Sequence, residues 1–160
     1  MDPTEEIIKE YLEYCKRWFL IPRIQFKVPG NYSDIDFLAT DGKGKFYSIE
    51  VKWYSRYQYS KSECKELARA LTTKRRISAI KARTGKKPHA NILIMNDSML
   101  GQRSREEKLK IFRKQGIKVW FFDKILDEMT DKINPKGGYN SIAFQLLHML
   151  SYHEKLAKHI

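Results

Sequence analysis

The chain has 160 residues, enough for one buried core and too few for two ordinary domains, and its 42% hydrophobic and 31% charged composition is typical of a folded globular protein. It lacks an apolar run of about 18 residues that would span a membrane, and its acidic start differs from a signal peptide, so we expect a cytoplasmic protein. The net charge of +12 favours a polyanionic partner, nucleic acid before a membrane surface, although solubility alone is an alternative explanation.

The first predicted element is a helix over residues 4–19, because apolar residues recur at helical spacing behind Thr4, a residue type that caps helix N-termini. Three strands should follow over residues 24–28, 34–39 and 46–53, since apolar and polar residues alternate in each. The last two strands are joined by a short Gly-containing segment, which predicts a hairpin.

A long basic helix is predicted over residues 60–83, followed by a strand at 90–95 whose continuous apolar run suits parallel pairing with both faces buried. The remaining predicted elements are a helix at 104–115, a strand at 117–122, a short helix at 124–129, a loop at 134–138 and a helix at 141–159. This order predicts an α/β fold, in which helices pack on the faces of one mixed sheet. We expect a single domain over residues 1–160, with its core at about 4–122. A helical extension at about 124–160 would complete the core or form a homodimer interface.

Four charged side chains of the hairpin should lie on one face of the sheet, because side chains alternate along a strand. They are Asp34, Asp36, Glu50 and Lys52. If the turn is centred on Lys43, Asp36 lies directly opposite Glu50, and like charges in that position destabilise the pair unless a cation lies between them. A register shifted by two residues would instead pair Asp36 with Lys52 in an ordinary salt bridge.

A cation shared by Asp36 and Glu50 would suit Mg²⁺, which accepts one or two carboxylates and keeps several waters for a phosphate and a nucleophile. A metal in this place can polarise a phosphate, lower the pKa of a bound water and orient its attack. Lys52 can position that water or neutralise charge in the transition state. The alternative is a half-exposed hairpin with ordinary surface charges, because short motifs also match by chance.

The chain resembles the PD-(D/E)xK nuclease superfamily in two segments, SDIDFLA at 33–39 and SIEVKW at 48–53, and in the α-β-β-β-α-β order around them. The resemblance covers residues 4–96 and implies a restriction-endonuclease-like mixed sheet flanked by helices, with extra C-terminal helices. It implies that Asp36, Glu50 and the backbone carbonyl of Val51 hold Mg²⁺ or Mn²⁺, with Lys52 as the catalytic lysine. Ile35 stands where the family has its proline, which is a departure from the motif.

Within the superfamily, the small basic chain is most similar to archaeal Holliday-junction resolvases and related endonucleases. That likeness implies an Mg²⁺-dependent endodeoxyribonuclease that cuts branched or duplex DNA. Many members also place a glutamate of the first helix at the metal. Of Glu5, Glu6, Glu10 and Glu13, we favour Glu10, which borders the apolar stripe of the helix; the alternative is that all four are solvated surface charges.

Residues 61–87 carry six Lys and four Arg against two Glu and directly follow the strand that holds Glu50 and Lys52. Phosphate contacts dominate nucleic-acid affinity, so this segment predicts a phosphate track, with a solvated helix face as the alternative. Aromatic residues mixed with basic ones after Lys52 can stack on unpaired bases, although we expect Trp53 in the core. The residues expected to bind nucleic acid are Arg56, Arg69, Lys74, Arg75, Arg76, Lys81, Arg83, Tyr54 and Tyr57.

Three functions fit these observations. The first is a metal-dependent endonuclease on DNA, with branched or junction DNA as a candidate substrate. The second is a non-catalytic nucleic-acid-binding module on the same fold, although such a module has no need of both Glu50 and Lys52. The third is a nuclease that acts on RNA or at specific DNA sequences.

Overall fold

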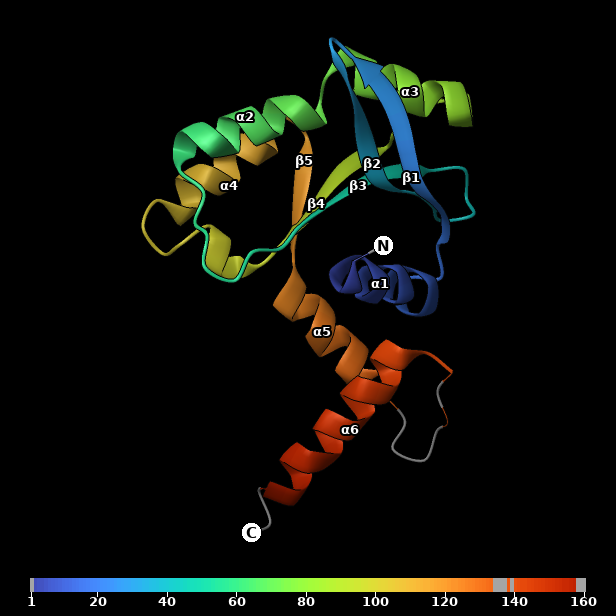
Figure 1. The fold of residues 1–160 in the computed structure, drawn as a ribbon, viewed down its shortest axis with the longest axis vertical. Coiled ribbons are helices and arrows are strands. Elements are labelled where there is room, and N and C mark those ends of the chain that lie inside the picture. Colours follow the sequence, from blue (N-terminus) through green and yellow to red (C-terminus); the bar gives the residue numbers. More distant parts are fainter. Residues whose placement is uncertain (1, 134–137, 139, 158–160) are drawn as a thin grey trace.

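The computed structural model of the chain describes residues 2–133, 138 and 140–157 (Figure 1). Five strands form one sheet in the order β1-β2-β3-β4-β5. The elements in chain order are α1 (Pro3–Glu10), the π-helix η1 (Tyr11–Cys15), β1 (Phe19–Val28), β2 (Asn31–Thr40), β3 (Phe46–Lys52), α2 (Lys61–Leu71), α3 (Lys74–Thr84), β4 (Ala90–Met95), the 3-10 helix η2 (Asp97–Met99), α4 (Arg105–Lys114), β5 (Ile117–Phe121), α5 (Phe122–Asp131) and α6 (Ile142–Ala157).

The sheet is mixed, as the sequence predicts. β1, β2 and β3 pair antiparallel, whereas β3, β4 and β5 pair parallel. The β2–β3 register joins Phe37 to Ile49 and Thr40 to Phe46, which confirms a turn centred on Lys43. The continuous apolar run of β4 is buried on both faces, as expected for a central parallel strand. The α/β fold predicted from the order of elements is therefore confirmed.

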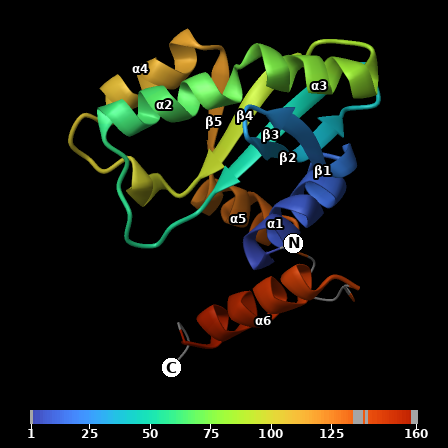
Figure 2. The ribbon, with the colours of Figure 1, turned by 45° about the horizontal axis from the view of Figure 1, so that its top comes forward.

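Helices cover both faces of the sheet (Figure 2). On one face, Leu93 and Met95 of β4 pack with α2 and α4 around the buried Phe112. On the other face, Phe37 and Ile49 pack with α1, η1, α5 and the start of α6. Alternate residues of one strand thus reach different cores, because strand side chains point to opposite faces in turn.

The first helix is shorter than predicted. α1 ends at Glu10, continues as the π-helix η1, and gives way to β1 already at Phe19. Asp2, rather than Thr4, caps it by accepting a hydrogen bond from the backbone N–H of Glu5. Pro22 lies inside β1, an edge strand of the sheet, where a residue without a backbone donor is tolerated.

The basic segment forms two helices rather than one. α2 ends at Leu71, and α3 begins behind Thr73, whose side chain accepts a hydrogen bond from the backbone N–H of Arg76. Threonine competes for backbone donors in this way and therefore favours a helix start over a helix interior. The break sets which face α3 turns towards the sheet: Arg76 and Ile80, four residues apart, are its buried residues.

The C-terminal elements agree with the prediction in kind and differ at their ends. α5 extends over Phe122–Asp131, and Ser104 precedes α4 without a side-chain capping bond. The predicted loop at 134–138 lies, except for residue 138, outside the described residues. Ala143 and Phe144 of α6 join the core, whereas large apolar side chains of the same helix are exposed. The homodimer interface expected there stays a prediction. In the described part of the chain, none of the helices has the length and apolar character that a bilayer crossing requires.

Candidate active site

Asp36 and Glu50 lie where β2 separates from β3. The ladder between these strands ends at Phe37 and Ile49, and one step further in the same register stand Asp36 and Glu50. Here a side chain replaces a backbone acceptor: Oδ2 of Asp36 accepts a hydrogen bond of 2.7 Å from the backbone N–H of Val51. The carbonyl of Val51 points to the same edge of the strand as its N–H, and therefore towards Asp36.

Glu50 is buried, with 7% of its surface exposed, and both of its carboxylate oxygens are engaged. Oε1 lies 2.7 Å from Nζ of Lys52, and Oε2 lies 3.1 Å from a guanidinium nitrogen of Arg76. Burying a carboxylate is costly unless opposite charges and hydrogen bonds accompany it, and here two cations do so. The three residues therefore form one charged cluster on the face of the sheet that α2 and α3 cover.

Arg76 is buried and does not belong to the predicted phosphate track. Only 3% of its surface is exposed, so its guanidinium is out of reach of a bound phosphate. Its side chain donates to the hydroxyl of Ser48 at 3.1 and 3.3 Å, to the backbone carbonyl of Asp34 at 3.2 Å and to Glu50. The prediction was wrong because Arg76 shares a helix face with Ile80, and the way α3 lies against the sheet turns that face inwards.

The electrostatics of the site couple its ionisable groups. Burial, with the Glu50 carboxylate adding to it, raises the pKa of Asp36 to about 7, against the Val51 hydrogen bond and Lys52, which lower it. Burial acts to lower the pKa of Lys52, but Glu50 and Asp36 outweigh it and raise that pKa above its ordinary value. Lys52 thus stays protonated, while Asp36 changes charge near neutral pH.

The backbone around Asp36 is irregular. Ile35 packs with Ile24 and Ile80, whereas Phe37, two residues along, packs with the core under α1. Arg23, which faces Asp36 across the β1–β2 register, has a positive φ of 40°, and that pair is missing from the ladder. Non-glycine residues adopt such a φ at a cost, and sites of this kind cluster around functional groups.

The first-helix glutamate nearest the site is Glu5, not the expected Glu10. The charge of Glu5 contributes to the raised pKa of Asp36, and its carboxylate lies 3.3 Å from Arg23. Glu10 sits at the other end of α1 and accepts a hydrogen bond from the hydroxyl of Ser141 beside α6. The sequence pattern could not place α1 along the sheet, so it could not tell these two glutamates apart.

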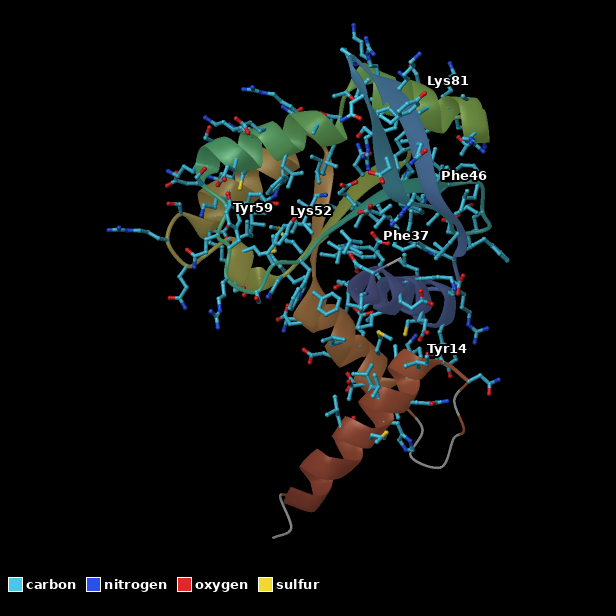
Figure 3. All side chains as sticks on the ribbon, in the orientation of Figure 1. Tyr14, Phe37, Phe46, Lys52, Tyr59 and Lys81 are labelled. Carbon is cyan, nitrogen blue, oxygen red and sulfur yellow. The ribbon has the colours of Figure 1, made fainter. Side chains whose placement is uncertain are left out.

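The remaining predicted nucleic-acid contacts lie at the surface. Tyr54 and Tyr57 are about half exposed and contact each other edge to face, while the hydroxyl of Tyr57 donates to Glu63. Trp53, expected in the core, is 43% exposed against Phe122. Figure 3 shows Lys52 and Tyr59 on the α2 side of the sheet and Lys81 well away from them on α3. The exposed cations of the predicted track are Arg56, Arg69, Lys74, Arg75, Lys81 and Arg83.

The donors around Asp36 and Glu50 suit a hard divalent cation, because such ions take oxygen ligands and tolerate only one or two carboxylates beside waters. The Asp36 and Glu50 carboxyl groups are close enough to interact electrostatically, and Asp36 accepts a hydrogen bond from the backbone N–H of Val51. Across residues 2–133, 138 and 140–157, no cluster of three or more His, Cys, Asp or Glu side chains is placed to hold a metal. The ligand set on offer is thus smaller than the one expected with Glu10.

Comparisons with known proteins give one distant likeness. No family model matches the chain, and no curated protein matches it. Among solved structures, it is similar to "Crystal Structure of Protein of Unknown Function AF1548", with 14% sequence identity and a TM-score of 0.48. The alignment covers 75% of this chain and 58% of that one. The chain therefore spans little more than half the length of that protein, and so distant a likeness carries no argument about function.

Proposed function

We propose that this protein is a metal-dependent endonuclease that hydrolyses phosphodiester bonds in DNA, on a core of the restriction-endonuclease kind. The observation that carries the proposal is the convergence of Asp36 and Glu50 from neighbouring strands, with the ammonium group of Lys52 beside them. A sheet that buries two like charges next to each other loses stability, and such an arrangement is more common at functional sites than elsewhere.

In this proposal, Asp36, Glu50 and the carbonyl of Val51 hold Mg²⁺ or Mn²⁺. The metal would supply charge stabilisation and a more acidic water. Lys52, which stays protonated beside Glu50, places its positive charge where the phosphate becomes more negative in the transition state. Asp36 must be ionised to act as a ligand, so the raised pKa of its carboxyl group opposes metal binding below neutral pH.

The same proposal assigns the DNA backbone to the exposed cations that flank the site. Arg69 lies in the last turn of α2, and Lys74 and Arg75 lie in the first turn of α3. The break between the two helices is next to Arg76, which contacts Glu50. Cations at this junction can hold phosphates next to the carboxylates. Tyr54 and Tyr57 stand exposed in the segment that follows Lys52, where an unpaired base of a branched substrate can stack on them.

A substrate panel tests the proposal. Branched, linear duplex and single-stranded DNA, with RNA of matching shape, would be incubated with the protein and Mg²⁺, and in parallel with EDTA. We expect cleavage of DNA, strongest on branched DNA, that EDTA abolishes. Cleavage that survives EDTA would refute the metal site. Cleavage of RNA alone would show that the protein is a ribonuclease.

A second function is favoured by one observation, namely that Lys52 and Arg76 already neutralise Glu50. On that basis the cluster can be a structural ion network in a non-catalytic nucleic-acid-binding module. Such a module would bind the same panel with equal affinity in Mg²⁺ and in EDTA and would cut none of it. Measuring both the binding and the cleavage of the same substrates, in Mg²⁺ and in EDTA, thus separates the two functions.

A further inference from the structure

Arg76 occupies a position that a simple pair of metal-binding carboxylates would not require. It reaches from the first turn of α3 to both strands of the site, through the carbonyl of Asp34 on β2 and the side chains of Ser48 and Glu50 on β3. The N-terminal turn of α3 is itself fixed, since Thr73 caps the backbone N–H of Arg76. The guanidinium therefore holds the two strands together just where their own ladder has ended.

One oxygen of each carboxylate is held by a backbone group or by a buried guanidinium. Oδ2 of Asp36 accepts from Val51, and Oε2 of Glu50 accepts from Arg76. The oxygens held neither by the backbone nor by Arg76 are Oδ1 of Asp36 and Oε1 of Glu50. Oε1 lies 2.7 Å from Nζ of Lys52, and a lysine side chain rearranges more readily than a buried guanidinium. Two-metal sites need carboxylates that bridge ions about 3.5–4 Å apart, and a carboxylate held at one oxygen bridges poorly.

The charge balance points the same way. When Asp36 is ionised, it and Glu50 carry two negative charges, and Arg76 and Lys52 carry two positive ones. A second divalent ion would add two more positive charges to a partly buried site in which both oxygens of Glu50 already contact cations.

We propose that Arg76 is a positioning residue that keeps one oxygen of Glu50 away from the metal, so that the site takes a single divalent cation held through one oxygen of each carboxylate. This inference rests on the proposed function, because it presumes that the carboxylates bind a metal. It adds the number of ions and a role for a residue that neither touches the substrate nor binds the metal.

The experiment is a titration of the whole chain with Mn²⁺ in the absence of DNA, followed by electron paramagnetic resonance of the free ion. We expect one Mn²⁺ per chain. Arg76→Gln removes the fixed charge and frees Oε2, so we expect Mn²⁺ to bind about tenfold more tightly. Arg75→Gln is the matched control, since it removes the same charge from the exposed neighbour, and its Mn²⁺ affinity should stay within about twofold.

The outcomes separate this inference from the proposed function. Two Mn²⁺ ions per wild-type chain would overturn the single-ion site and leave the nuclease standing, whereas no bound Mn²⁺ would overturn both. A folded Arg76→Gln variant with unchanged or weaker Mn²⁺ affinity would make Arg76 merely structural. Should that variant not fold, Ser48→Ala takes its place, because it removes two hydrogen bonds of the guanidinium at constant charge. We expect it to tighten Mn²⁺ binding about threefold, and unchanged affinity would count against the proposal.

Discussion

The two faces of β3 differ in the kind of side chains that they carry. Ile49 and Val51 face the α1 side and pack with Phe37, Ile92 and Ile94 in an apolar core. Ser48, Glu50 and Lys52, interleaved with them, face the α2 and α3 side and form a network of charges and hydrogen bonds with Arg76. Alternate residues of β3 thus belong either to an apolar core or to a charged network, because side chains along a strand point to opposite faces in turn.

The difference is confined to a few positions, because the α2 side of the sheet also carries the apolar core around Phe112. Apolar burial stabilises the fold with few geometric demands, whereas a buried ion network gains little over a well-packed apolar replacement. A chain selected for stability alone would carry apolar residues at positions 48, 50 and 76. The proposed function accounts for their polarity, and substitutions at Glu50 and at Ile49 should therefore have opposite effects on activity and stability.

The largest effect is expected from Glu50→Gln, which removes a ligand of the proposed metal and keeps the shape of the side chain. Cleavage should fall at least about a thousandfold, because the charge that holds the cation is lost. The rate of Mg²⁺-dependent DNA cleavage by purified variant measures this. Glu66→Gln, an exposed glutamate on α2, is the control and should cleave like the wild type. A Glu50→Gln protein that is folded and cuts at the wild-type rate would end the catalytic assignment.

The neighbouring residue on the other face should behave in the opposite way. Ile49→Ala leaves a cavity in the core under α1, where Ile49 has no exposed surface. The free energy of unfolding should drop by about 3 kcal/mol, while cleavage per folded molecule stays near the wild-type rate. Chemical denaturation and cleavage below the unfolding transition measure the two quantities. A large loss of activity at unchanged stability would mean that the two faces are not independent.

The sequence predicts which residues of β2 and β3 lie on each face, because that depends on local patterns. It does not predict the contacts that depend on how the helices lie against the sheet. Alternation in β2 and β3, together with a turn centred on Lys43, predicts the Asp36 and Glu50 register, because both signals are local. The burial of Arg76 depends on the break at Thr73 and on how α3 lies against the sheet. The choice between Glu5 and Glu10 depends likewise on the placement of α1, which no spacing within that helix determines.

A smaller effect is expected from pH at Asp36. Because its pKa rises to about 7 on folding, the folded state binds a proton more tightly than the unfolded chain. Its contribution to stability is therefore complete below the ordinary aspartate pKa and is lost as the pH rises through about 7. Asp36→Asn should remove that loss, so the wild type should fall relative to the variant by about 2–4 kcal/mol between acid and mildly alkaline pH, since each pKa unit corresponds to about 1.4 kcal/mol.

Denaturant unfolding of both proteins at several pH values gives this difference. Saturating Mg²⁺ at alkaline pH should restore the stability of the wild type and leave Asp36→Asn unchanged, because a bound ligand stabilises only the form that binds it. Parallel pH curves for the two proteins would show that Asp36 does not carry the shifted pKa.

The smallest effect is expected at the surface beside the network. Arg75 is exposed next to the buried Arg76, so Arg75→Glu should weaken DNA binding about three- to tenfold at low salt and leave Mn²⁺ binding nearly unchanged. The loss should shrink as salt rises, since screening weakens exposed charges most. Arg113→Glu, an equal change of charge on α4, is the control. If both variants lose the same affinity, DNA binding depends on the net charge of the protein alone. A loss confined to Arg75→Glu means that the DNA backbone contacts the start of α3, next to Arg76, which contacts Glu50.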